Sequence, residues 1–454
     1  MTSTTKNLII GFGKAGKTLA SHLAKLGEQV TLIEQSEQMY GGTCINIGCI
    51  PSKKLIHESQ YHSFTEAMHS KDQLITQLRT ANYNKLNHES NITVINATAK
   101  FQNDNTVILS NGNTITAERI FINTGAVSNI PPITGLNALF NQYIFDSTGI
   151  LSLNHYKDNA PNHLVIIGGG FIALEFAFMY RAFGSQVTIL ETADTLIAHQ
   201  DEDIRQEILT IMARHNIQVM TGVNISEFAQ SDNTNNNTDN TVAIKLTQNN
   251  QAIDDIFADV VLIATGRKPN TQTLELHNTS IQLTERGFIQ VDEHLKAADN
   301  IWAMGDVAGS PQFTYISLDD YRIVINQLFG DGNRNTKDRN VFPTSVFINP
   351  PLSHIGMTEK QAINANKNYH LLTLKANDIV KAKVINQTDG LLKAIIDKDT
   401  GLILGVTLLC AESHELINLF KLAMDYHIPA AYFKSQIFTH PTMAEGMNDL
   451  FAGL

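Results

Sequence analysis

Two of the three cysteines in this 454-residue chain stand close together, in the run Gly42-Thr43-Cys44-Ile45-Asn46-Ile47-Gly48-Cys49. Two thiols at this spacing can transfer two electrons by forming and breaking a disulfide. A disulfide that only staples the fold is the alternative. It fits poorly, because a chain of this length buries a sufficient core without staples and the sequence gives no sign of secretion. We therefore expect Cys44 and Cys49 to be redox-active.

The spacing of the two cysteines predicts an irregular turn between them. The segment after Cys49 has a helical pattern. On an ideal helix, residues five apart are separated by roughly 7.5 Å along the axis and about 140° around it. A disulfide needs Cα atoms roughly 4.4–6.8 Å apart. A bridge from Cys44 to Cys49 therefore requires a distorted turn, which we expect at Gly48, and strained, accessible bridges are the reducible ones.

A nucleotide-binding pattern precedes the cysteines. An apolar strand at 7–10 leads into a glycine-rich turn, a helix through residue 26 and a second strand that ends at Glu34. Gly11 and Gly13 allow a tight turn and close approach of a pyrophosphate, and Gly16 permits close helix–strand packing. The helix N-terminus favours phosphate, and Glu34 can accept hydrogen bonds from ribose hydroxyls. A purely structural glycine turn is the alternative, but the strand, helix, strand and acid are all in register for a dinucleotide.

The same pattern recurs in the middle of the chain. A strand at 163–167 precedes Gly168-Gly169-Gly170-Phe171-Ile172-Ala173, and the next strand, 186–190, ends at Glu191. Two such units predict two dinucleotides. A carboxylate at Glu191 can accept from a ribose 2′-hydroxyl and repels a 2′-phosphate, which favours NADH over NADPH.

Composition limits the remaining possibilities. The net charge is −11, 43% of residues are hydrophobic and no stretch approaches 18 uninterrupted apolar residues. We therefore expect a protein that binds neither nucleic acid nor membrane and that works in the reducing cytoplasm.

Other segments complete the expected fold. Residues 119–126 and 260–270 pair a strand with a turn, where we expect the chain to cross between domains. The polar run 230–240 is expected as a solvated hairpin loop, and 330–338 as a linker. Four later strands, at 345–348, 371–374, 391–396 and 403–409, predict a separate domain. The predicted fold class is α/β, with two Rossmann-like dinucleotide-binding domains and a C-terminal α+β domain. We expect Trp302 and Cys410 in the core.

Taken in order, these motifs resemble those of the two-cysteine flavoprotein disulfide reductases, class I of the flavoprotein pyridine nucleotide-disulfide oxidoreductases. This family includes glutathione reductase, dihydrolipoamide dehydrogenase and mercuric reductase. The resemblance also covers Ala264-Thr265-Gly266-Arg267-Lys268-Pro269-Asn270, Gly305-Asp306 and His440-Pro441-Thr442-Met443-Ala444-Glu445. Within the family, segments 11–20, 40–44, 313–322 and 436–440 are most similar to the RclA type. These are bacterial reactive-chlorine-resistance flavoproteins, some of them hypothiocyanous acid reductases.

The resemblance implies FAD in residues 1–150 and 271–338, a reduced nicotinamide cofactor in 151–270, and a homodimer formed by 339–454. It implies that Cys44 attacks the substrate and that Cys49 contacts the flavin. The matched FAD positions are Gly11, Gly13, Gly16, Glu34, Gly42, Thr43, Lys53, Thr124, Gly125 and Asp306, and the nicotinamide positions are Gly168, Gly170, Ala173, Glu191 and Gly266.

Three further matches concern acid–base chemistry. Lys53 and Glu175 match an ion pair beside the flavin. His440 and Glu445 match a pair that reaches across the dimer interface into the partner's cysteine site. His440 can hold the proton of Cys44 and return it to a departing thiolate, and Glu445 can orient the imidazole.

Departures from the family narrow the expected substrate. The C-terminus carries no extra cysteine pair, unlike mercuric reductases and large thioredoxin reductases, and Phe438 replaces a histidine common in disulfide reductases. We therefore expect a small thiol-reactive oxidant, foremost hypothiocyanous acid, with Cu(II) as a further activity. Reduction of a low-molecular-weight disulfide or lipoyl group is the alternative, and a flavin-bound sensor or scaffold without turnover is a third. The spacing of His57 and His62 is poor for a metal, and no resident metal is expected.

Overall fold

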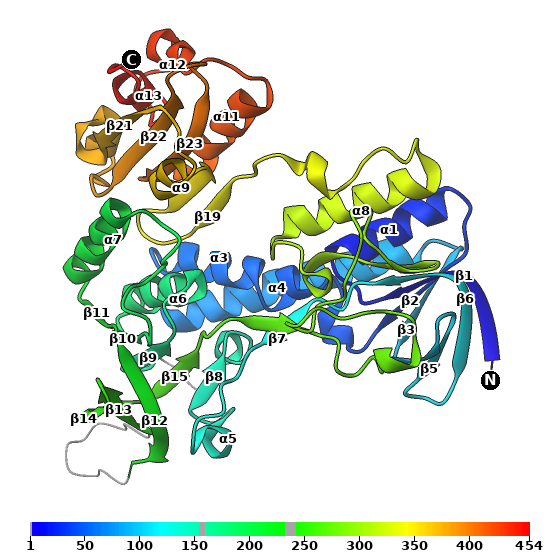
Figure 1. The fold of residues 1–454 in the computed structure, drawn as a ribbon. Helices are drawn as coiled ribbons and strands as arrows, with labels where there is room; N and C mark the ends of the chain where they lie inside the picture. Colours follow the sequence, from blue (N-terminus) through cyan, green and yellow to red (C-terminus); the bar gives the residue numbers. More distant parts are fainter. Residues whose placement is uncertain (1, 154–158, 232–241) are drawn as a thin grey trace.

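The computed structural model describes residues 2–153, 159–231 and 242–454. It contains three large sheets, which lie at the right, lower left and upper left of Figure 1. The fold class is the predicted one, a mixed α/β chain with two parallel nucleotide-type sheets and an antiparallel C-terminal sheet. Residues 232–240 of the expected hairpin loop lie outside the described residues.

The first sheet has the strand order β17-β18-β6-β1-β2-β3. In addition, β5 pairs with the first residues of β6, and β4 pairs with β5. All pairs from β18 to β3 are parallel, as expected for strands connected by helices. The helices α1 and α8 pack side by side on this sheet (Figure 1). The strands are β1 (Thr2–Ile10), β2 (Val30–Glu34), β3 (Ile92–Asn96), β4 (Ala99–Asn103), β5 (Thr106–Leu109), β6 (Thr114–Ile122), β17 (Lys296–Ala298) and β18 (Ile301–Ala303), and the helices are α1 (Lys14–Lys25) and α8 (Thr314–Phe329).

The second sheet repeats this topology. Its order is β11-β10-β9-β15-β8, with every pair parallel, and the antiparallel sheet β12-β13-β14 lies beside it. The strands are β8 (Ile144–Asp146), β9 (His163–Ile167), β10 (Gln186–Leu190), β11 (Ile217–Met220), β12 (Val223–Gln230), β13 (Val242–Gln248), β14 (Gln251–Ala258) and β15 (Val260–Ile263), and the helices are α5 (Leu136–Leu139), α6 (Phe171–Ala182) and α7 (Glu202–Arg214).

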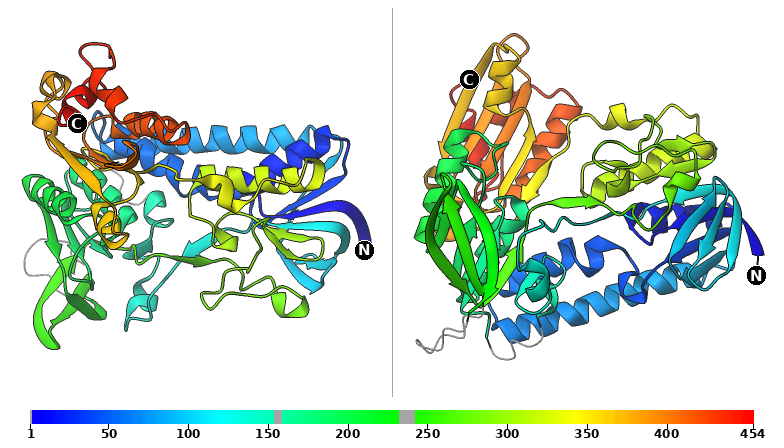
Figure 2. Two further views of the ribbon diagram at one scale, coloured as in Figure 1. Left: turned by 45° about the horizontal axis from the view of Figure 1, so that its top comes forward. Right: turned by 60° about the horizontal axis from the view of Figure 1, so that its bottom comes forward.

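Two features connect these sheets. The short strands β7 (Ala126–Ser128) and β16 (Arg267–Pro269) pair antiparallel where the chain passes from one sheet to the other and back, as expected. The helices α3 (Cys49–Glu58) and α4 (Phe64–Asn87) run between the two sheets (Figures 1 and 2). Because α3 contacts α6 while α4 contacts β3, the cysteine segment lies at the junction of the two nucleotide-type units.

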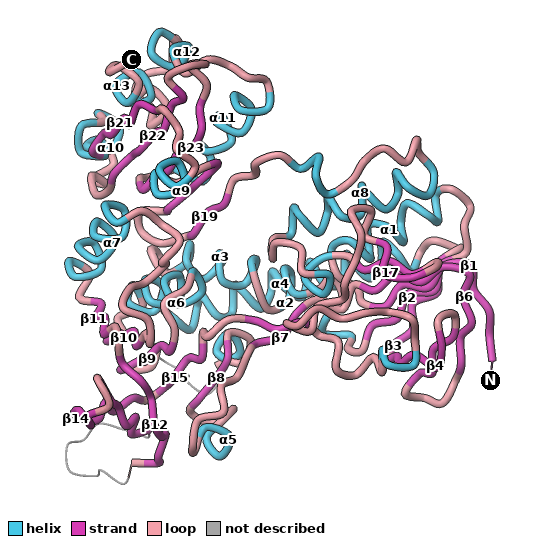
Figure 3. The backbone as a smooth tube through the Cα atoms, in the orientation of Figure 1, coloured by secondary structure: helices cyan, strands magenta, loops and turns pink. Residues whose placement is uncertain are grey.

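The C-terminal part is an antiparallel sheet of order β19-β20-β23-β22-β21, with short helices around it, as the tube in Figure 3 shows. The expected linker 330–338 is fixed to α8, since Arg334 pairs with Asp319. The strands are β19 (Thr344–Val346), β20 (Leu352–Gly356), β21 (Tyr369–Lys375), β22 (Leu391–Asp397) and β23 (Ile403–Leu409), and the helices are α9 (Glu359–Asn364), α10 (Val380–Val384), α11 (Ser413–Asp425), α12 (Ala431–Ser435) and α13 (Gly446–Leu450).

The expected core residues are buried. Trp302 stacks on Phe121 with ring centroids 5.2 Å apart, and Cys410 is fully buried in the C-terminal core. Among the described helices, none is long and apolar enough to cross a membrane.

Candidate active site

Cys44 and Cys49 lie on either side of a break between two helices. The helix α2 (Thr43–Asn46) ends before Ile47, and α3 begins at Cys49. Gly48 lies between them with φ −135° and ψ −114°, outside the helical region, and a Cβ at this position would come within 3.0 Å of the carbonyl oxygen of Thr43. The distortion expected at Gly48 is therefore present, and it places the two free thiols close enough to change each other's pKa.

The two thiols differ in acidity. A hydrogen bond from the Cys44 thiol and the positive charge of Lys53 lower the pKa of Cys49 to about 6, against the opposing effect of burial. The same hydrogen bond, together with burial, raises the pKa of Cys44. The hydroxyl of Thr314 lies 3.8 Å from the Cys49 sulfur. At neutral pH the pair therefore carries its negative charge on Cys49 and its proton on Cys44.

Lys53 and Glu175 form the predicted ion pair. Lys53 Nζ lies 2.6 Å from Glu175 Oε2. The other carboxylate oxygen accepts a hydrogen bond of 3.0 Å from the backbone N–H of Phe347, and Lys53 Nζ lies 4.9 Å from the centroid of the Phe347 ring. Glu175 is buried. The pair thus fixes α3 against α6 and against the C-terminal sheet.

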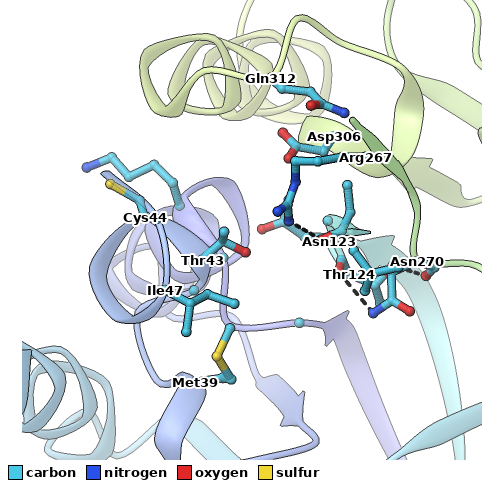
Figure 4. A pocket seen from close by; sticks show the side chains of 18 of the residues that line it. Met39, Thr43, Cys44, Ile47, Asn123, Thr124, Arg267, Asn270, Asp306 and Gln312 are labelled. Atoms are coloured by element: carbon cyan, nitrogen blue, oxygen red, sulfur yellow. Dashed lines mark hydrogen bonds between the residues drawn. The ribbon is translucent and has the colours of Figure 1, made fainter. Parts of the chain in front are cut away.

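Both cysteines line a cavity of about 340 Å³ that extends over the first glycine turn. Figure 4 shows Thr43 and Cys44 on one side and Arg267 beside Asp306 on the other. Of the residues predicted for FAD binding or electron transfer, these line it: Gly11, Gly13, Glu34, Gly42, Thr43, Cys44, Cys49, Lys53, Thr124, Gly125, Glu175 and Asp306. Segments far apart in sequence therefore meet around one space.

The first glycine turn is closed around the side chain of Asn123. A Cβ at Gly11 would lie 2.3 Å from the carbonyl oxygen of Asn123, and one at Gly13 would lie 2.4 Å from its Oδ1. Asn123 Oδ1 accepts from the N–H of Gly16 at 2.9 Å, and Nδ2 donates to the carbonyl of Met304 at 2.6 Å. Asn123 therefore ties the glycine turn to the loop that carries Asp306.

The polar groups of the cavity fit a flavin dinucleotide. The helix α1 begins after Gly13, which makes no side-chain cap, so the N–H groups of Lys14 and Ala15 are available to phosphates. Glu34 accepts from the N–H of Phe12 at 2.9 Å, and burial raises the pKa of this carboxyl group. Burial also raises the pKa of Asp306, while the charge of Arg267 lowers it. Glu34, which is buried, and Asp306, which is half-buried, can accept hydrogen bonds from hydroxyl groups of a bound cofactor.

The second glycine turn has the same construction. Gly168 has φ +112°, and a Cβ there would lie 2.5 Å from the carbonyl oxygen of Ala264. Gly170 and Gly266 face open space, whereas Ala173 is fully buried. Glu191 Oε1 accepts from the N–H of Ala193 at 2.7 Å and from the hydroxyl of Thr192 at 3.0 Å. The expected nicotinamide residues thus surround one helix start, that of α6.

His440 and Glu445 form a pair away from this cavity. His440 Nδ1 lies 2.7 Å from Glu445 Oε2, and 68% of the histidine side chain is exposed. Neither belongs to the described residues that line the cysteine cavity. Within one chain, therefore, the pair is assembled but does not meet the thiols.

Sequence reasoning assigned no role to three residues that shape this site. Asn123, Arg267 and Thr314 act through contacts with residues more than one hundred positions away. Asn123 precedes Thr124-Gly125 as Ala264 precedes Thr265-Gly266 in the second unit. The polar Asn123 in place of the apolar Ala264 was the sequence signal that could have pointed to the role of Asn123.

The chain was compared with known proteins. Residues 5–320 match the family model for pyridine nucleotide-disulphide oxidoreductase, and residues 342–451 match that for its dimerisation domain. The probable pyridine nucleotide-disulfide oxidoreductase RclA of Escherichia coli (strain K12) is 46% identical over 450 residues, 98% of each chain. Mercuric reductase of Staphylococcus aureus is 30% identical over 97% of this chain and 80% of that protein. Dihydrolipoyl dehydrogenase of Geobacillus stearothermophilus is 29% identical over 97% and 94%.

Solved structures of RclA have the same fold as this chain. The HOCl-induced flavoprotein disulfide reductase RclA from Escherichia coli superimposes with a TM-score of 0.92 at 45% identity, over 98% of this chain and 99% of that one. Its Cu(II) complex gives a TM-score of 0.93 over 99% of both chains. The chain therefore belongs to the pyridine nucleotide-disulfide oxidoreductase family and is an RclA-like flavoprotein disulfide reductase.

Proposed function

We propose that this protein is an FAD-dependent NADH oxidoreductase that uses Cys44 and Cys49 to reduce a small thiol-reactive oxidant, foremost hypothiocyanous acid, in defence against reactive chlorine and thiocyanate species. The observation that carries the proposal is the pair of free thiols at one end of a cavity whose other walls fit a flavin dinucleotide. The likeness to an HOCl-induced relative supports the defensive role. We place the reaction in the cytoplasm, because its catalytic thiols need a reducing compartment.

FAD, when bound, accepts a hydride from the nicotinamide and passes two electrons to the disulfide. We assign its binding to residues 1–150 and 271–338, and that of the nicotinamide cofactor to 151–270. Lys53 contributes a positive charge next to Cys49, which stabilises the thiolate released when the disulfide opens. Glu175 holds that lysine in place.

The two thiols act in turn. Cys44, which holds the shared proton at rest, gives it up as its sulfur attacks the sulfur of hypothiocyanous acid, the S–O bond breaks, and hydroxide leaves and takes up a proton to become water. The Cys49 thiolate then attacks the Cys44 sulfur, and thiocyanate leaves as the disulfide forms. The two thiols thus supply the two electrons that the oxidant consumes. An oxidant of this size needs little recognition surface.

We assign the proton transfers at Cys44 to the partner subunit's His440. The dimerisation domain supports a homodimer. In one chain His440 is exposed, already oriented by Glu445, and remote from its own thiols. The exposed Ile437, with 90% of its surface accessible, lies three residues before it, as expected for a segment that packs against a second subunit.

NADH is the proposed donor rather than NADPH. Glu191 directly follows β10. In this type of fold, the adenosine ribose of the dinucleotide binds at that place. Its side chain is already oriented by hydrogen bonds from Thr192 and Ala193. A fixed carboxylate there favours a ribose hydroxyl and repels a phosphate.

Two other substrates have specific support. Cu(II) reduction is suggested by the Cu(II) complex of the relative and by two thiols next to the flavin cavity. Reduction of a low-molecular-weight disulfide or lipoyl group is suggested by 29% identity to a dihydrolipoyl dehydrogenase. Against the latter, Phe438 packs on the C-terminal core at the position where many relatives carry a histidine.

Steady-state NADH consumption tests the proposal. The purified flavoprotein is given hypothiocyanous acid, Cu(II), glutathione disulfide or lipoamide in parallel, with NADH or NADPH as donor. Fast turnover with hypothiocyanous acid and slow turnover with both disulfides is the expected result. Turnover confined to a disulfide would contradict the oxidant-defence role and favour the ordinary disulfide reductases.

A further inference from the structure

Lys17 contacts the backbone just before α2, the short helix that carries Cys44. It follows Gly16 in α1, and its ammonium nitrogen donates to Asn82 Oδ1 on α4 at 2.7 Å and to the carbonyl oxygen of Gly41 at 3.3 Å. Gly41 precedes Cys44 by three residues. Lys17 is not among the described residues that line the cofactor cavity, so its contacts are with the cysteine segment and α4.

A positive charge is costly at this place. Burial, together with repulsion by Lys14 and Lys85, lowers the pKa of Lys17 to about 8, although attraction to Cys44 acts in the opposite direction. The residue also stands near the start of α1, where the helix dipole disfavours a cation. Local folding energetics therefore do not explain why a lysine occupies the position.

The duplicated nucleotide unit shows that the fold does not require a cation here. Leu174 follows Ala173 at the equivalent position of the second turn, and it is fully buried. The two units share their topology, their first two glycine positions and their helix starts. Among the described residues, only in the first unit does the side chain at this position form a hydrogen bond with the cysteine segment. The presence of a lysine at this position therefore correlates with the neighbouring cysteine segment and not with nucleotide binding.

We infer that Lys17 is a positioning residue for the attacking thiol: it holds the Gly41 carbonyl and supplies the positive charge that stabilises the Cys44 thiolate. This inference rests on the proposed role of Cys44. The charge of Lys17 lowers the pKa of Cys44, while that of Lys53 lowers the pKa of Cys49. The two lysines therefore divide the electrostatic support of the two thiols between them.

The test measures thiolate formation at Cys44 without NADH or any oxidant. In the FAD-loaded Cys49→Ser protein, Cys44 is the one remaining active-site thiol, because Cys410 is fully buried. Its alkylation by iodoacetamide is followed by peptide mass spectrometry between about pH 6 and pH 10, which brackets ordinary thiol pKa values. The same protein is compared with added Lys17→Met, Lys17→Gln or Lys17→Arg, and with Lys25→Met as a control on the exposed end of the same helix.

The inference predicts that Lys17→Met and Lys17→Gln slow alkylation about three- to tenfold at neutral pH, as expected on losing a nearby opposite charge. The rates should converge with the parent at high pH, Lys17→Arg should restore most of the loss, and Lys25→Met should have no effect. Lys17→Gln keeps a hydrogen-bond donor, so it carries the test if Lys17→Met fails to fold. Three results would overturn the inference. The pH profile could be unchanged, alkylation could slow by the same factor at every pH, or the charge-removing variants could lose FAD. Because no turnover is measured, a negative result here is distinct from a failure of the proposed oxidant reduction.

Discussion

Lys53 lies one helical turn after Cys49 on α3, so its ammonium group stands on the same side of the helix as the thiol. It is held there by the 2.6 Å ion pair with Glu175. The positive charge contributes to the lowered pKa of Cys49, about 6. One ion pair therefore links the acidity of a thiol to the packing of two nucleotide-type units.

Lys53→Met should raise the pKa of Cys49 from about 6 toward the ordinary thiol value of about 8.5. The Cys44→Ser background isolates Cys49 and keeps a hydroxyl that can donate to it. The pH dependence of Cys49 alkylation gives the measurement. Lys54→Met is the control, since Lys54 pairs with Glu58 instead. Equal pKa values with and without Lys53 would show that its charge does not act on the thiol.

Cys44→Ser should abolish oxidant-dependent NADH consumption while FAD stays bound, because a hydroxyl is a far weaker nucleophile than a thiolate. Turnover and flavin content are measured on the same preparation. Cys410→Ala, in the C-terminal core, should retain activity. If Cys44→Ser kept full activity, the dithiol mechanism would be wrong and the flavin itself would react with the oxidant.

Asn123→Leu should destabilise the protein and weaken FAD binding. It leaves the N–H of Gly16 and the carbonyl of Met304 without their partner, and each unpaired buried group costs about 1–3 kcal/mol. Urea unfolding and FAD release give the two measurements, with Asn111→Ala in an exposed turn as the control. If unfolding free energy and FAD release both kept their wild-type values, another group would have to form hydrogen bonds with the Gly16 N–H and the Met304 carbonyl.

The glycine turns, the cysteine pair and its irregular turn could be predicted from the sequence, because they depend on local backbone geometry. The Lys53–Glu175 and His440–Glu445 pairs could also be predicted, though through family resemblance rather than through spacing. Asn123 was missed because its role depends on Gly16, 107 residues away, and nothing in local sequence shows that contact.

Charge pairing across the chain was equally hidden. The polar segment 330–338 is expected as a linker, yet Arg334 pairs with Asp319 on α8. Lys393 reads as an ordinary strand lysine, yet it is buried among acidic residues from α7 and α9. A sequence shows the charges but not which of them share a buried space.

Lys393→Met should destabilise the protein at neutral pH by about 3 kcal/mol, because it leaves the buried carboxylate of Asp201 without its cation. Lys393 Nζ lies 2.6 Å from Glu359, 2.9 Å from Asp203 and 3.2 Å from Asp201. Burial raises the pKa of Asp201, but hydrogen bonds from two backbone N–H groups and the charge of Lys393 bring it below its usual value.

The pH dependence of this effect has a definite sign. A carboxyl group with a lowered folded-state pKa stabilises the fold above its unfolded pKa of about 3.9, and this contribution is lost as the pH falls through the folded value. The gap in unfolding free energy between wild type and Lys393→Met should therefore narrow in acid. Urea unfolding at several pH values measures it, with the exposed Lys398→Met as control. A gap that is constant with pH would exclude the electrostatic explanation.

Glu191→Ala should shift the nucleotide preference toward NADPH. Removing one carboxylate close to the 2′-phosphate relieves a repulsion of roughly 1–4 kcal/mol, so the ratio of kcat/KM for NADPH to that for NADH should rise about tenfold or more. Glu202→Ala, on the exposed first turn of α7, is the control. An unchanged ratio would place the selectivity elsewhere in the second unit.

In the proposed mechanism, Cys44 and Cys49 together reduce one oxidant molecule. A single turnover tests this: the NADH-reduced enzyme receives one equivalent of hypothiocyanous acid, free thiols are then alkylated, and the peptides are identified by mass spectrometry. We expect a Cys44–Cys49 disulfide in the wild type and a thiocyanate adduct on Cys44 in Cys49→Ser. Consumption of the oxidant with both thiols still free to alkylate would contradict it.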